Sequence, residues 1–147
     1  MNINKKLLEN WTNVNDDYVI AIGDSMMREL PLGQIVQTQD YQVIDGKKRL
    51  SAVYRLFNED FYFDLDAMAS DSDLNWCTTE KTGNVVSVED ILNAKFSALS
   101  KYAKKDETLD KLHAMISAFR AYRFQILVLS YKFNDKDFKM IRERLNR

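Results

Sequence analysis

Residues 41–50, YQVIDGKKRL, combine an extended run, a glycine turn and a cluster of cations. The run over residues 41–44 leads into Asp45 and Gly46, a pair that favours a tight turn. Beyond the turn, apolar residues recur at three- and four-residue steps, as on the buried side of a helix over residues 47–58. The stretch therefore predicts a strand that turns into a helix opening with three positive charges.

The segment upstream predicts a helix followed by another strand. Residues 16–30 (DDYVIAIGDSMMREL) begin with two acids, which favour a helix N-terminus, and place most of their apolar residues on one face. Pro31 and Gly33 end this helix, because proline cannot continue the hydrogen-bond ladder and glycine tolerates unusual torsions. A short extended run follows over residues 34–37.

Downstream, the pattern alternates between strands and helices. Residues 61–65 (FYFDL) are aromatic-rich and predict a strand. A serine N-cap followed by acids predicts a helix over residues 87–102, and a further helix is expected over residues 107–122. Residues 125–133 (QILVLSYKF) are dense in apolar and β-branched residues, which predicts a central strand, and a final helix capped by Asn134 or Asp135 reaches the C-terminus. The order predicts an α+β fold, a mixed sheet packed with helices.

Composition limits the class of protein. The 147 residues, 46% hydrophobic and 29% charged, carry no linker or repeat, so we expect one domain over residues 1–147. A single Cys77 and a single His113 exclude a disulfide framework, a multi-cysteine metal site and paired-histidine catalysis. No run approaches the roughly 18 apolar residues of a membrane span, and no signal-like leader opens the sequence. We therefore expect a cytoplasmic protein without a membrane partner.

Charge is distributed unevenly along the chain. Residues 1–100 hold 9 Lys/Arg against 16 Asp/Glu, whereas residues 101–147 hold 12 against 6. Two interpretations stay open: a nucleic-acid-facing basic end, or two halves that attract each other and present solvated helix faces. The C-terminal segment adds Lys136, Lys139 and Arg142 to the first interpretation, since Lys/Arg contacts to phosphates dominate nucleic-acid binding.

The cations after the glycine turn point to anion binding. A helix start exposes backbone N–H groups and a positive partial charge, so anions bind there, while positive side chains are disfavoured. Gly46 lets the backbone approach a phosphate, Arg49 offers a planar fork, and Lys47 and Lys48 are point charges. Asp45 is a candidate to orient Arg49, hold a ribose hydroxyl or help ligate magnesium. The alternative is an ordinary turn followed by solvated lysines.

Three blocks of the sequence resemble one known family. Residues 44–54 (IDGKKRLSAVY) resemble the Asp-Gly-Gln-Gln-Arg-Leu-Thr motif of the N-terminal domain of GmrSD-type restriction proteins, within the ParB/sulfiredoxin-like superfamily. Residues 25–35 (SMMRELPLGQI) resemble the family's helix and Pro-Ile-Gly turn. Residues 122–129 (YRFQILVL) and 142–146 (RERLN) resemble its late strand and closing helix. The blocks follow the family order, with a helical insertion before the last strand.

This resemblance implies a nucleotide-handling module of bacterial or phage defence and restriction. In such proteins the motif serves nucleoside triphosphate binding or hydrolysis, with Mg²⁺ assisting, and a Gly-x-x-Arg turn cradles the triphosphate. Gly46 and Arg49 match that core, and Asp45 matches the preceding acid, so Asp45 and Arg49 are the candidate catalytic residues. Residues expected to contribute from neighbouring elements are Arg28, Arg144 and Asn146.

Departures from the family pattern favour binding over catalysis. Lys47 and Lys48 replace both glutamines, which keeps phosphate attraction but removes an amide that could position a water. No His-Asn-His nuclease module is present in the sequence. Whether the chain is an NTPase or a nuclease is left open by these residues.

Two other functions remain as alternatives. The first is a non-enzymatic phage- or plasmid-encoded protein that modulates a host defence complex, and the second is a DNA-binding regulator. The acids Asp64, Asp66, Asp71 and Asp73 lack the Gly and Glu of a calcium loop, so an acidic surface is expected there rather than a metal site. Cys77 is expected to be a small buried residue.

Overall fold

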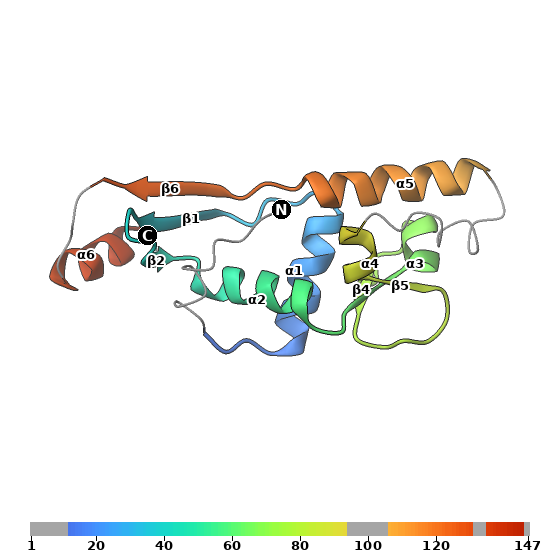
Figure 1. Ribbon diagram of the computed structural model, residues 1–147, viewed down its shortest axis with the longest axis horizontal. Helices are drawn as coiled ribbons and strands as arrows, with labels where there is room; N and C mark the ends of the chain where they lie inside the picture. Colours follow the sequence, from blue (N-terminus) through green and yellow to red (C-terminus); the bar gives the residue numbers. More distant parts are fainter. Residues whose placement is uncertain (1–11, 94–105, 131–134, 146–147) are drawn as a thin grey trace.

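The computed structural model describes residues 12–93, 106–130 and 135–145 (Figure 1). Within them the chain forms six helices and two three-stranded sheets, which confirms the α+β class. Where the sequence predicted one mixed sheet, the described strands form two. No helix among the described residues combines the length and apolar character needed to cross a membrane.

The first sheet is mixed and has the order β2-β1-β6. Its centre is β1 (Gln34–Thr38), which pairs antiparallel with β2 (Val43–Asp45) and parallel with β6 (Gln125–Leu129). The first two strands match the runs predicted at 34–37 and 41–44 to within two residues at each end. A strand from near the end of the chain therefore lies beside one from its first quarter.

Both faces of β1 are covered, and different helices cover them. On one face Ile35 packs with Val43 and with Leu50 of α2 (Lys47–Asn58). On the other face Val36 and Ile44 pack with Leu129 and with Ile141 of α6 (Asp135–Leu145). The alternation follows from the strand geometry, which sends successive side chains to opposite faces. It places the start of α2 and the C-terminal half of α6 at the same end of the molecule (Figure 1).

The second sheet is short and antiparallel. β3 (Tyr62–Asp64) lies between β4 (Cys77–Thr78) and β5 (Val85–Ser87). The strand predicted at 61–65 is confirmed, whereas the outer strands and the short helix α3 (Leu65–Ala69) were not foreseen. Strands of two and three residues are too short to show an alternating pattern, so their sequence carries no signal.

The main core lies between the second sheet and three helices, α1 (Asp16–Met27), α2 and α5 (Asp106–Ala121). Phe119 of α5 is fully buried and packs edge-to-face on Phe63 and Phe57, with ring centroids 5.0 and 6.3 Å away. Figure 1 shows α5 running along one long side of the molecule and continuing into β6. One element thus connects the core to the first sheet.

Helix boundaries agree closely with the sequence, with one early ending. α2 spans the predicted residues 47–58, and α5 lies one residue from the predicted 107–122. α1 ends at Met27 rather than at residue 30, because Glu29 adopts a left-handed φ of 60° and reverses the chain. The N–H groups of Glu29 and Leu30 then bond back to the last turn, as in a Schellman motif.

The helix predicted over 87–102 begins as expected and is described only in part. Ser87 caps α4 (Val88–Leu92), since its Oγ accepts a hydrogen bond of 3.0 Å from the Asp90 N–H. Residues 94–105 lie outside the described part of the chain, as do residues 131–134 of the predicted late strand and Asn134 as a cap. The final helix is confirmed as α6.

The prediction of a central strand over residues 125–133 does not agree with the described part of the segment. Among the described strands β6 lies at the edge of its sheet, and Ile126, Leu127 and Val128 are 47, 42 and 48% exposed. A dense apolar run is typical of a strand with neighbours on both sides, but β6 has only β1 beside it in the described chain. The prediction of a single sheet is wrong for a separate reason, because the described strands form two sheets.

Phe119→Ala is expected to lower the free energy of unfolding by about 3–5 kcal/mol, because it leaves a large cavity against Phe57 and Phe63. Urea denaturation followed by circular dichroism measures the change. Leu74→Ala is the matched control, since Leu74 is 76% exposed and should change stability by no more than about 0.5 kcal/mol. Equal effects of the two substitutions would contradict the placement of Phe119 in the core.

Candidate functional site

A pocket of about 420 Å³ opens where β2 turns into α2. Its wall contains the glycine turn and the three cations that follow it. Residues from two other helices complete it, Tyr18 of α1 and Arg142 of α6. The lining residues are Tyr18, Ile44, Asp45, Gly46, Lys47, Lys48, Arg49 and Arg142. The structure thus brings together the whole 45–49 motif predicted from the sequence, around one cavity.

Gly46 is the N-cap of α2 and has a left-handed φ of 99°. A Cβ at this position would lie 3.0 Å from Cγ1 of Ile35, so the turn packs directly on β1. Glycine offers no side chain to cap the helix, and the first turn contains no acid. The helix therefore begins with uncapped N–H groups and three cations, an arrangement that attracts anions.

The Arg49 side chain is held beside this turn by two contacts. Its Nη1 donates a 2.6 Å hydrogen bond to the carbonyl oxygen of Leu32, and its Nη2 pairs with Oδ2 of Asp45 at 3.3 Å. A Cβ on Gly33 would collide with Nη1, so the guanidinium group packs against that glycine. The side chain is 20% exposed. Arg49 and Asp45 thus form a pair that joins the α1–β1 turn to α2.

The other cations at the pocket are exposed. Lys47 and Lys48 extend from the first turn of α2. Arg142 reaches the pocket from α6, because its neighbour Ile141 packs on Val36 and Ile44. Four cations and one carboxylate therefore line the cavity. Sequence reasoning missed Tyr18 and placed Arg142 only in the basic C-terminal segment and in the block that resembles the family's closing helix.

Arg28 is not brought to this pocket, which corrects the sequence-based prediction. It forms an ion pair with Asp24 at 3.0 Å and donates hydrogen bonds of 2.8 and 2.9 Å to the carbonyl oxygens of Ser72 and Leu74. Its guanidinium carbon lies 3.9 Å from the ring centre of Trp76. Arg28 therefore fastens the loop after α3 to the end of α1, which is a structural role.

The two C-terminal candidates have different outcomes. Arg144 is exposed on α6 and does not line the pocket, so Arg142, two residues earlier, occupies the position expected for it. Asn146 lies outside the described residues. The helix that carries Arg144 does reach the pocket, but through Arg142.

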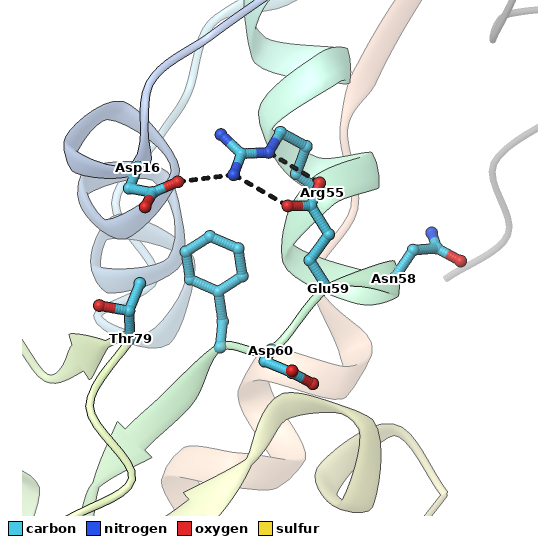
Figure 2. A pocket seen from close by; sticks show the side chains of 7 residues that line it. Asp16, Arg55, Asn58, Glu59, Asp60 and Thr79 are labelled. Carbon is cyan, nitrogen blue, oxygen red and sulfur yellow. Dashed lines mark hydrogen bonds and ion pairs between the residues drawn. The ribbon is translucent and has the colours of Figure 1, made fainter.

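A second pocket, of about 410 Å³, surrounds Arg55 between α1 and α2 (Figure 2). Arg55 bonds to both carboxylate oxygens of Glu59, at 2.8 and 2.9 Å, and to Asp16 at 2.6 Å. Hydrogen bonds to Glu59 and then to Asp16 raise the pKa of Arg55 above its ordinary value. Its Nη1 also donates to the carbonyl oxygen of Val14. The Nε, Nη1 and Nη2 groups of Arg55 all donate to partners within the protein. This pocket is therefore a weaker candidate for a ligand site than the pocket at the start of α2.

The aspartates at and after the end of β3 serve local structure. Asp64 caps α3 by accepting bonds from the N–H groups of Asp66 and Ala67. Asp66 accepts from the amide of Asn84, and Asp71 pairs with Lys111 at 2.7 Å. Within the described ranges, no group of three or more His, Cys, Asp or Glu side chains is arranged to hold a metal ion.

Cys77 is buried under α1, in agreement with the sequence-based prediction. A Cβ on Gly23 would lie 2.9 Å from its sulfur, so the thiol packs directly against the helix backbone. Burial, and secondarily the charge of Asp24, raises the pKa of the Cys77 thiol to about 12. The thiol is therefore protonated and inert at neutral pH.

The comparisons with known proteins find no likeness: no family model, curated protein or solved structure matches this chain. The resemblance to GmrSD-type proteins accordingly depends on the quoted motifs alone. The geometry of the pocket is independent of that resemblance.

Alkylation of Cys77 by iodoacetamide at pH 8 is expected to be roughly 1,000-fold slower in the folded protein than in urea, because the thiolate fraction falls with the raised pKa. Mass spectrometry of quenched time points measures the rate. Since the unfolded thiol ionises near 9.0 and the folded one near 12, stability should also fall between these pH values. Rapid alkylation of the folded chain would contradict the buried placement.

Proposed function

We propose that the chain binds a phosphorylated ligand, a nucleotide or a DNA phosphate, in the pocket at the start of α2. One observation carries the proposal. An uncapped helix N-terminus without acids opens into a cavity lined by Lys47, Lys48, Arg49 and Arg142. Positive side chains at a helix start oppose the macrodipole, so a bound anion would relieve an unfavourable arrangement.

Within this proposal the cations have different tasks. The exposed Lys47, Lys48 and Arg142 contact phosphate oxygens, together with the N–H groups of the first helical turn. Arg49 already donates to Leu32 and Asp45, and it acts mainly as a positioning residue that keeps the turn in shape. The volume of about 420 Å³ falls in the usual range for small-molecule pockets.

A nucleoside triphosphate with Mg²⁺ is the ligand that the family resemblance favours. Magnesium usually binds one or two carboxylates and the phosphates of the substrate, and Asp45 is the carboxylate that lines this pocket. The ion would neutralise phosphate charge there. No glutamine is among the described residues that line the cavity and could orient an attacking water, so we place binding ahead of hydrolysis. The proposed setting is a bacterial or phage defence system, with an NTPase or nuclease reaction as the lesser alternative.

A regulator that binds DNA is a second candidate, and one observation favours it. Arg142 extends the pocket onto α6, where Lys136 and Lys139 are also exposed. A phosphate backbone could therefore pass from the pocket along this helix. Binding of this kind weakens steeply as salt is added, because counterions are released from the nucleic acid.

Thermal unfolding with a panel of nucleotides tests the main proposal. At a ligand concentration of 100 times the dissociation constant, the folded state should gain about 2.7 kcal/mol, and the melting temperature should rise accordingly. Lys47→Ala combined with Lys48→Ala should remove this rise. These side chains are exposed, so in the absence of ligand the double variant should have the same melting temperature as the wild type.

Lys136→Ala with Lys139→Ala is the matched control, because both lysines are exposed and neither lines the pocket. The control should retain the nucleotide-dependent rise. If it loses the rise as well, a general cationic surface binds the ligand, and if no nucleotide or oligonucleotide stabilises the wild type at millimolar concentration, the proposal is wrong. Arg49→Ala is less informative, since it also removes the bond to Leu32.

Lys47→Gln with Lys48→Gln tests the link to the family motif. Restoring both glutamines should weaken nucleotide binding, because two positive charges leave the pocket. It should also introduce release of inorganic phosphate from a triphosphate with Mg²⁺, which a colorimetric phosphate assay measures. Unchanged binding and no phosphate release would argue against the family-like role.

A further inference from the structure

Tyr18 gives the pocket at the start of α2 a wall of different chemistry. Among the described residues that line this pocket, five are charged, Gly46 has no side chain, and Ile44 is only 4% exposed. Tyr18 is half-buried and is the one aromatic residue in that lining. The pocket therefore combines cations with a single ring, and binding of a phosphate alone leaves the ring without a role.

The ring and the cations come from different elements around the pocket. In Figure 1 the start of α2 lies between α6 on the left and α1 on the right. Arg142 reaches the pocket from α6, and Tyr18 reaches it from α1. Lys47 and Lys48 lie on the first turn of α2 itself. A ligand that fills the pocket therefore has cations beside it on α2 and α6 and an aromatic side chain beside it on α1.

The pocket is larger than one phosphate group needs. Its volume of about 420 Å³ corresponds to about 14 water molecules at about 30 Å³ each. A phosphate beside the N–H groups and cations of the first turn of α2 would fill only part of this volume. The part on the side of α1 suits an uncharged group with a flat face, because a tyrosine ring offers apolar area and a π-face.

The backbone that carries Tyr18 is held in place relative to the cations. Arg55 of α2 donates hydrogen bonds of 2.7 and 2.6 Å to the Val14 carbonyl oxygen and to Asp16, so it ties the start of α1 to the helix that carries the lysines (Figure 2). Asn15 caps α1 by accepting a 2.9 Å bond from the Tyr18 N–H. This turn of α1 is therefore positioned before a ligand binds, which lowers the entropy that binding costs.

We infer that a nucleobase stacks on Tyr18 and that the ligand of the pocket is a nucleoside polyphosphate. Its phosphates lie at the first turn of α2, and its base lies against the ring. The inference rests on the proposed function and narrows it, because two other sources of phosphate become poorer ligands. Inorganic polyphosphate has no ring, and in duplex DNA the face of each base is covered by its neighbours.

Stacking on one tyrosine favours nucleotides in general over any particular base. Every base has a π-face, so this contact tolerates all of them. It is worth about 1–3 kcal/mol for one base, which corresponds to roughly 5- to 150-fold in affinity. We therefore expect ATP, GTP, CTP and UTP to bind with similar affinities, and all of them more tightly than a ligand without a base.

Calorimetric titration with ATP and with inorganic tripolyphosphate, both with Mg²⁺, tests the inference. Both probes contain three linked phosphate groups, and tripolyphosphate carries at least as much negative charge, so tighter binding of ATP comes from its nucleoside. The wild type should bind ATP roughly 5- to 150-fold more tightly than tripolyphosphate. Tyr18→Ala should lower the affinity for ATP to that for tripolyphosphate and leave the latter unchanged, whereas a merely structural role would weaken both alike.

Three further variants serve as controls. Tyr18→Phe keeps the ring and should keep the preference for ATP. Tyr18→Leu keeps an apolar side chain against the core but removes the ring, so it should lose the preference even if Tyr18→Ala does not fold. Tyr62→Ala is the matched control, because Tyr62 is also half-buried but lies on β3, outside the lining of the pocket, and this variant should keep the preference. Circular dichroism measures whether each variant is folded.

The outcomes separate this inference from the proposed function. If neither probe binds the wild type at millimolar concentration and a duplex oligonucleotide does not bind either, the proposed function is wrong, and so is the inference. If ATP and tripolyphosphate bind equally, only the inference is wrong, and the pocket takes phosphate without a base. Equal weakening of both probes by Tyr18→Ala, or a duplex oligonucleotide that binds more tightly than ATP whether or not Tyr18 is present, also overturns the inference alone.

Discussion

The bond between the Arg49 side chain and the Leu32 carbonyl connects the parts of this molecule that surround the pocket. Arg49 lies in the first turn of α2, Leu32 precedes β1, and the same guanidinium group pairs with Asp45 at the end of β2. A Cβ on Gly33 would collide with the Arg49 guanidinium group, and a Cβ on Gly46 would press against Ile35 of β1. One side chain therefore links a strand, a turn and a helix at the place where the exposed cations begin.

Most elements of the fold could be predicted because their signals are local. The helix over residues 47–58 has a glycine N-cap and a regular apolar face, and both can be read within twelve residues. β4 and β5 have no such signal, since their position depends on β3, which lies between them. The edge position of β6 was not predicted either. A run of apolar residues indicates that a strand is covered, but it does not show which part of the structure covers it.

The candidate site shows the same division between local and distant information. The sequence indicated residues 45–49 as one group, and they line one pocket because neighbours along a turn remain neighbours in space. It did not show that Arg49 is already engaged by a backbone carbonyl, nor that Tyr18 and Arg142 complete the wall. Arg28 was chosen by its place in a motif, and its partners in the loop after α3, including Trp76, lie more than 40 residues away. Contacts of that kind depend on tertiary packing.

The parallel pairing of β1 with β6 has a consequence for how the chain acquires its structure. β1 lies in the first quarter of the sequence and β6 near its end, so the contact closes a loop that contains nearly all the other elements. Long-range pairing of this type slows folding, because the entropy of loop closure is lost before the contact is gained. During synthesis, β1 can pair only with β2 until β6 has left the ribosome. The first sheet is therefore expected to be completed late in folding.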